Sequence, residues 1–89
     1  MARAYKVPGD MDAAAMKAQR QIFEELATSD DDVAIDMSAV EFIDSSGVGA
    51  IVFVYKRLLA GGRKVTLQRL NGQPMQLLTY LRLTDLVAK

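Results

Sequence analysis

The order of apolar and polar positions predicts three short strands, each followed by a helix. Residues 3–7 alternate between polar and apolar side chains, and Tyr5 and Val7 fall on one face of a strand. Residues 33–37 are mainly apolar and follow a polar turn, which favours a buried strand. Residues 65–69 have the pattern of a third strand.

Residues 12–27 predict the first helix. They are rich in alanine, methionine, lysine, glutamine and glutamate, which are good helix formers. A carboxylate at Asp10 or Asp12 is suited to cap this helix, because it accepts hydrogen bonds from the free N–H groups of the first turn. We expect one continuous helix with an apolar stripe formed by Ala15, Ala18, Ile22 and Leu26.

Residues 48–60 allow two interpretations. Their β-branched side chains favour a strand, whereas their length and their helical stripe favour a helix. We choose the helix, since Lys56 and Arg57 lie near its end, where cations suit the helix dipole, and Gly61 is a natural cap. The apolar face is so wide that we expect it to be buried almost all round.

Weaker signals complete the pattern. Pro74 suits the first turn of a third helix, and the spacing of Ser38 and Glu41 allows a single helical turn with a capping box. Residues 84–89 are expected to form a short tail with an extended end. Four apolar side chains near this end are expected to pack, or else to form a partner-binding patch: Tyr80, Leu81, Leu83 and Leu86.

The alternation of strands and helices predicts an α/β fold. We expect a small, mainly parallel or mixed sheet with helices packed against it and right-handed crossovers. In such sheets function collects at the carboxyl ends of the strands. The run Asp44-Ser45-Ser46-Gly47 follows the second strand and opens the second helix, so we place it at that edge.

Composition narrows the functional classes. The 89 residues suit a single domain over residues 1–89, and equal numbers of basic and acidic residues, 11 each, argue against nucleic acid as a partner. There is no histidine and no cysteine, so we expect no Ser-His triad, no metal site and no cofactor. Asp30-Asp31-Asp32 is expected to be a solvated loop rather than a cation site. The longest apolar run, residues 48–55, is too short to span a membrane, and we expect a cytoplasmic protein without membrane insertion.

The run Asp44-Ser45-Ser46-Gly47 is the one motif with chemistry of its own. Aspartate and serine at a helix start are usually caps, which contribute about 1 kcal/mol each. The alternative is a phosphorylation site, in which the first-turn N–H groups receive a phosphate on Ser45 that adds about −1.5 to −2 of charge. Gly47 and Gly49 are expected to leave the backbone open to a partner.

Residues 33–49 resemble the central signature of the STAS domain family, which covers sulfate transporter domains and anti-sigma factor antagonists. The matching features are an apolar strand, a short turn, the pair Phe42-Ile43, and Asp44-Ser45-Ser46-Gly47 at the start of a helix. Two further segments match, namely Gly61-Gly62 after that helix and Gly9-Asp10-Met11-Asp12 in place of the family's Gly-Glu-Leu-Asp loop. The resemblance covers about residues 3–87.

The resemblance to the anti-sigma factor antagonist branch implies a phosphorylatable switch and not an enzyme. In that branch the first serine of the motif, here Ser45, is phosphorylated by a serine kinase that is also the anti-sigma factor, and a phosphatase reverses the modification. The unmodified protein binds the kinase and the phosphorylated protein releases it, which implies transcription regulation by partner switching in a bacterial cytoplasm. The residues implied in partner binding are Asp12, Asp44, Ser46, Gly47 and Val48.

Two other interpretations stay open. Some standalone STAS domains resemble this chain and bind the ATPase of a lipid-transporting ABC complex without phosphorylation. The other interpretation is a small hydrolase with Ser45 or Ser46 as nucleophile, although no histidine is present to activate a serine. The chain has one strand, residues 3–7, where the family often has two, so we expect the family's first strand to be missing. The resulting sheet edge is available for a homodimer.

Overall fold

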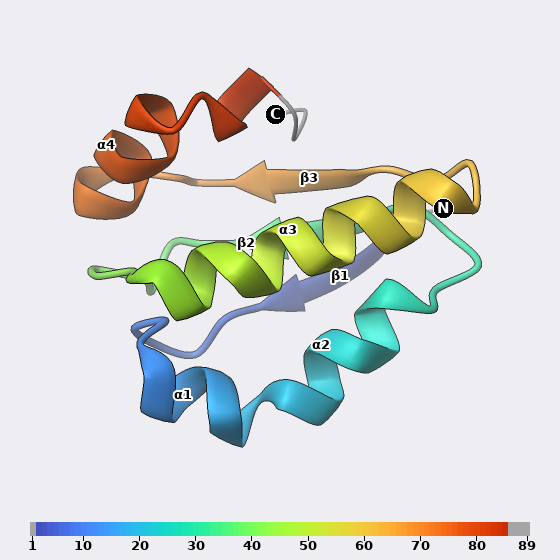
Figure 1. The fold of residues 1–89 in the computed structure, drawn as a ribbon, viewed down its shortest axis with the longest axis horizontal. Coiled ribbons are helices and arrows are strands. Elements are labelled where there is room, and N and C mark those ends of the chain that lie inside the picture. The colour runs from blue at the N-terminus through green and yellow to red at the C-terminus, as the bar shows by residue number, and fades with distance from the viewer. Residues whose placement is uncertain (1, 86–89) are drawn as a thin grey trace.

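The computed structural model describes residues 2–85, and Figure 1 shows its helices and strands in chain order. The three strands of this part of the chain form one parallel sheet in the order β1-β2-β3. The predicted α/β fold with a parallel sheet is therefore confirmed. The elements are β1 (Arg3–Lys6), α1 (Ala13–Ala18), α2 (Arg20–Ala27), β2 (Val33–Asp36), α3 (Ser45–Ala60), β3 (Val65–Gln68), α4 (Gly72–Tyr80) and the 3-10 helix η1 (Leu83–Asp85).

The helices α1, α2 and α3 cover one face of the sheet. In Figure 1 α3 lies across the strands and α1 and α2 lie below β1; the Cα atoms span 19 Å along the shortest axis, which suits one helix layer on one sheet. Tyr5 shares its register with Ile35 and Leu67, and its ring packs edge-to-face with the ring of Phe23 of α2, with the ring centroids 6.1 Å apart. The core therefore lies between this face and the helices. The opposite face carries polar side chains at the next register position: Lys6, Asp36 and Gln68.

The core depends on the central strand and on one side of α3. Ile35 of β2 is fully buried, and Ile51, Val54 and Leu58 of α3 are at most 1% exposed. Each such side chain contributes about 1.5–3 kcal/mol on burial. The expectation that α3 is buried almost all round is wrong, because the sheet and α2 cover only its inner side and Leu59 on the outer side is 56% exposed.

The first helix is broken where the sequence predicted a continuous one. Gln19, at φ −101° and ψ 9°, separates α1 from α2. The Tyr5 hydroxyl donates a hydrogen bond to Gln19 Oε1 at 2.6 Å, which ties the break to β1. Burial raises the pKa of Tyr5, so this donor keeps its proton well above neutral pH. The predicted stripe is wrong at Ile22, which is 38% exposed; the buried residues are Met16, Phe23, Leu26 and Ala27.

The connection from β2 to α3 contains a turn and not a helical turn. The Ser38 N–H donates to Asp36 Oδ1 at 2.9 Å, and the Glu41 N–H donates to Asp10 Oδ1 at 3.1 Å. The expected capping box between Ser38 and Glu41 does not form, because carboxylates from elsewhere in the chain already accept these backbone groups. The predicted single helical turn is therefore wrong.

The C-terminal part packs less than expected. Pro74 lies in the first turn of α4, as predicted. Tyr80 is 83% exposed and Leu81 is 44% exposed, so the packing expected of them is wrong. Both follow the inner residues of α4 and point away from the core, whereas Leu83 is half-buried against the core. Of the predicted tail, Thr84 and Asp85 belong to the 3-10 helix η1, and residues 86–89, Leu86 included, lie outside the described residues.

Candidate functional site

Two loops lie side by side at the carboxyl end of the sheet. Met11 forms a parallel bridge with Ile43: the Met11 N–H donates to the Phe42 carbonyl at 2.9 Å, and the Asp44 N–H donates to the Met11 carbonyl at 3.3 Å. The Met11 side chain is fully buried. The bridge joins the loop after β1 to the start of α3, so residues 10–13 and 41–45 form one structural unit.

Asp10 and Asp12 of the first loop accept hydrogen bonds from different backbone segments. Asp12 caps α1, since its Oδ1 accepts a hydrogen bond from the Ala15 N–H at 2.9 Å. Asp10 is not a helix cap: its Oδ1 accepts from the Glu41 and Phe42 N–H groups, each at 3.1 Å. The Asp10 side chain therefore holds the second loop, residues 41–45, against the first loop.

Asp44 joins the starts of two helices. Its Oδ1 accepts hydrogen bonds from the Ser46 N–H at 2.8 Å and the Gly47 N–H at 3.3 Å, which caps α3. Its Oδ2 accepts from the Ala13 N–H at 3.2 Å, in the first turn of α1. The expectation that first-turn N–H groups are free for a phosphate on Ser45 is wrong at Ser46 and Gly47, because Asp44 already occupies them.

The site residues differ in how far they reach the surface. The side chains of Ser45 and Ser46 are exposed, Asp12 and Asp44 are half-exposed, and Val48 is half-buried against the core. Gly47 is buried, and an added Cβ would lie 2.5 Å from Ile43 Cγ1 and 2.6 Å from the Met11 carbonyl oxygen. Gly47 thus allows close packing inside the protein, and the expectation that it leaves the backbone open to a partner is wrong. Gly49, in contrast, has free space around it.

An open groove of about 300 Å³ runs beside Ser46, between α1 and α2 on one side and α3 on the other. It lies where the first helix breaks. Its polar residues are Ser46, Arg20 and Glu24, and the last two form an ion pair at 3.3 Å. Its apolar residues are Met16, Phe23, Ala50 and Phe53. The groove offers an apolar recess next to Ser46.

Gln73 is a site residue that sequence reasoning missed. The Ile43 N–H donates to Gln73 Oε1 at 2.8 Å, and Gln73 Nε2 donates to the Ile43 carbonyl at 3.0 Å. The residues directly before it, Asn71-Gly72, have only the composition of a turn. No local pattern indicates a contact that spans 30 residues.

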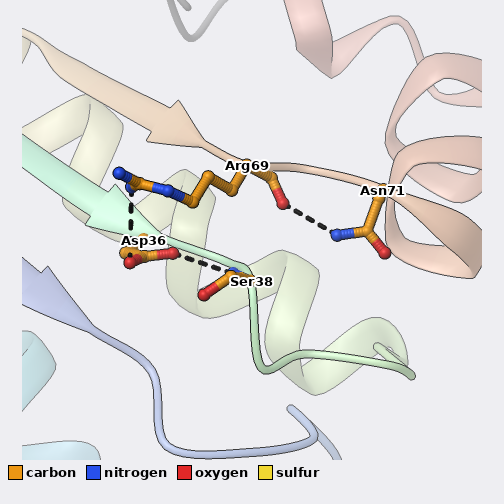
Figure 2. Close-up of polar contacts among 4 residues, drawn as sticks. All are labelled: Asp36, Ser38, Arg69 and Asn71. Carbon is orange, nitrogen blue, oxygen red and sulfur yellow. Dashed lines mark hydrogen bonds and ion pairs between the residues drawn. The ribbon is translucent and has the colours of Figure 1, made fainter.

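A polar network lies beside the site at the ends of β2 and β3. Figure 2 shows the Asp36 carboxylate between the Ser38 N–H and the guanidinium of Arg69, and Asn71 against the Arg69 carbonyl. The Ser38 backbone hydrogen bond lowers the pKa of Asp36, followed by the Ser38 side chain, while Arg69 and Lys6 add a smaller electrostatic effect. Asp36 is therefore a carboxylate at neutral pH.

Residues 2–85 hold no cluster of three or more histidine, cysteine, aspartate or glutamate side chains that is suited to a metal ion. Two residues of the acidic run Asp30-Asp31-Asp32 accept hydrogen bonds from a neighbouring segment: Asp32 Oδ1 accepts from the Lys64 N–H at 3.0 Å, and the Asp30 carbonyl accepts from Arg63 Nε.

No helix within residues 2–85 is long and apolar enough to cross a membrane.

The comparison with protein families agrees with this architecture. The family model described as STAS domain matches residues 2–89, nearly the whole chain. A search of curated proteins found no match. The matched residues include the parallel sheet, the two paired loops of residues 10–13 and 41–45, and the capped start of α3. The chain therefore belongs to the STAS domain family, whose domains have a general regulatory role in binding partner proteins.

Proposed function

We propose that this protein is a phosphorylation-controlled binding switch of the anti-sigma factor antagonist type. With Ser45 unmodified it binds a cognate serine kinase that is also an anti-sigma factor. Phosphorylation of Ser45 by that kinase releases the partner, and a phosphatase restores the binding form. We place this exchange in a bacterial cytoplasm, where it regulates transcription.

The observation that carries the proposal is the Asp44 carboxylate, which bonds to the first turns of both α1 and α3. Through it, the exposed Ser45 side chain is held next to the loop of Asp12. A partner that contacts this corner meets both loops at once. A modification of Ser45 therefore lies in the middle of the surface that we assign to partner binding.

Electrostatics explain how a phosphate acts there. It adds about −1.5 to −2 of charge beside Asp44. Because Asp44 already accepts the Ser46 and Gly47 N–H groups, the phosphate does not enter the helix start without displacing this carboxylate. It extends instead toward the bound partner. The added charge and bulk then favour release.

We propose binding and not catalysis as the activity. The sequence has no histidine, the usual general base that activates a serine nucleophile, and no cysteine to serve as the nucleophile instead. Its net charge of zero gives no long-range attraction to nucleic acid. Turnover of a generic ester by the wild type, lost in Ser45→Ala, would contradict this part of the proposal.

The test is a pull-down from the native host's lysate with wild type, Ser45→Asp and Ser45→Ala as bait, and partners identified by mass spectrometry. Gln21→Glu, an exposed change on α2, is the control for an added negative charge. We expect a kinase-like ATPase with wild type, Ser45→Ala and Gln21→Glu, and its loss with Ser45→Asp. A kinase retained equally by Ser45→Asp contradicts the switch.

The alternative is a constitutive subunit on the ATPase of a lipid-transporting ABC complex. It is favoured if the same pull-down recovers a transporter ATPase equally with all four baits. Ser45 then acts only at the start of α3, next to the Asp44 cap. The presence of two exposed serines in the motif favours the switch, since assembly alone requires no residue that can be phosphorylated.

We also propose self-association through the edge of β1. The Arg3 and Val7 N–H groups donate to the Asp32 and Asp36 carbonyls, at 2.7 and 3.1 Å. Since strand residues alternate, the backbone groups of Ala4 and Lys6 face the other way, and both residues are exposed. This edge is suited to pair with a second copy of the chain.

A further inference from the structure

Gln73 gives Ile43 the hydrogen bonds that a neighbouring strand would give. Its carboxamide accepts from the Ile43 N–H and donates to the Ile43 carbonyl, so one side chain pairs both backbone groups of one residue. On its other side Ile43 is bridged to Met11. Ile43 is therefore held between a loop and the first turn of α4, directly before Asp44.

The turn that carries Gln73 is fixed by the network at the strand ends. Arg69 and Gly72 have left-handed backbones, at φ 56° and φ 58°. This conformation is unfavourable for arginine, which has a Cβ. The Arg69 guanidinium lies 3.4 Å from Asp36 Oδ2, and Asn71 Nδ2 donates to the Arg69 carbonyl at 2.9 Å (Figure 2). These contacts hold the bend that directs Gln73 toward Ile43.

We propose that Gln73 is a positioning residue that couples the Ser45 motif to α4. The inference rests on the proposed function, in which the charge at Ser45 changes. A negative charge at Ser45 repels the carboxylate of Asp44, which directly follows Ile43. Because Gln73 binds both backbone groups of Ile43, a displacement there is passed to the first turn of α4. Signal transfer to α4 therefore depends on this carboxamide.

The first experiment measures amide hydrogen exchange by NMR in wild type, Gln73→Ala and Gln76→Ala. Gln76 is an exposed glutamine of the same helix and serves as the matched control. We expect exchange at the Ile43 N–H to be about tenfold faster in Gln73→Ala, the usual effect of losing a hydrogen bond. Ile35 in β2 should change by less than about twofold, since the rest of the sheet is untouched. Unchanged exchange at Ile43 overturns the proposal.

A second variant separates the two hydrogen bonds. Gln73→Glu keeps an acceptor for the Ile43 N–H and loses the donor to the Ile43 carbonyl. We expect it to retain most of the Ile43 protection, and this rescue keeps the test decisive if Gln73→Ala folds poorly. Protection as low in Gln73→Glu as in Gln73→Ala contradicts the assigned geometry.

The coupling itself is tested by adding Ser45→Asp to each background and recording amide chemical shifts. In wild type and in Gln76→Ala, the added charge should shift the amides of residues 73–76. In Gln73→Ala the changes should stop at Ile43, a result that a merely structural role does not produce. Equal shifts in α4 in all backgrounds overturn the proposal. No partner takes part in these measurements, so they stand or fail separately from the pull-down.

Discussion

The Asp44 carboxylate accepts a hydrogen bond from the Ala13 N–H at 3.2 Å, although the two residues are 31 positions apart in the sequence. The same side chain caps α3 through its other oxygen. One carboxylate thus determines how the start of α1 lies relative to the start of α3. The bridge of Met11 to Ile43 and the Asp10 side chain join the same two loops by other hydrogen bonds.

We expect Asp44→Ala to lower the free energy of unfolding by about 1–2 kcal/mol, the usual effect of removing a helix cap. Asp44→Asn should lose less, because its side-chain oxygen still accepts from the Ser46 N–H. Urea unfolding of the three proteins measures the difference. An Asp44→Ala protein as stable as wild type would show that the Asp44 hydrogen bonds contribute nothing.

Gly47→Ala should destabilise the protein by about 1–3 kcal/mol or more, since overpacking forces neighbours apart. The added methyl group would meet the Met11 backbone at 2.6 Å, and backbone does not yield easily. Gly49→Ala is the matched control in the same helix, where nothing lies within 4 Å. It should stabilise α3 by about 0.5–1 kcal/mol, because alanine is the better helix former. Equal melting temperatures for Gly47→Ala and Gly49→Ala would contradict the close packing of Gly47 against Met11.

The fold was largely predictable because its signals are local. β1 and β3 have alternating patterns and β2 is a short apolar run, while Asp12, Asp44 and Gly61 are residue types that commonly end helices. The break at Gln19 was not predictable, because a tyrosine from β1 stabilises it and the surrounding residues all favour helix. The predicted apolar stripe is wrong at Ile22 because the next residue, Phe23, packs inward against Tyr5 of β1.

The candidate site was predictable only in part. The cap at Asp44 could be recognised from its position before a helix. Its second bond to Ala13, the inward packing of Gly47 and the contact of Gln73 with Ile43 depend on segments that meet only in the folded chain. A sequence pattern shows which groups are able to bond, but the topology decides which of them meet.

Acidification should remove a contribution of Asp36 to stability. Its pKa is lowered in the folded protein, mainly by the Ser38 backbone N–H, relative to about 3.9 in the unfolded chain. The folded state therefore binds this proton more weakly, and the contribution is present above the unfolded pKa. It is lost as the pH falls through the lower, folded pKa. Urea unfolding of wild type between pH 7 and pH 2 should show this decline.

The control for this pH effect is Asp36→Asn, which cannot ionise. Its stability should fall less steeply than that of wild type below about pH 4, because one shifted carboxylate has been removed. Arg69→Gln should reproduce only a small part of the difference, since Arg69 lowers the Asp36 pKa less than the Ser38 hydrogen bonds do. Parallel curves for wild type and Asp36→Asn would contradict the lowered pKa.

Lys6→Pro should abolish the proposed homodimer while leaving the monomer folded. The Lys6 N–H faces away from β2, so proline removes a donor at the free edge and none from the β1–β2 ladder. Lys6→Ala is the control, since it removes the charge and keeps the N–H. Sedimentation velocity at rising concentration should show dimers for wild type and Lys6→Ala and monomers for Lys6→Pro. A wild type that stays monomeric throughout, or a Lys6→Pro protein that dimerises equally well, excludes pairing through β1.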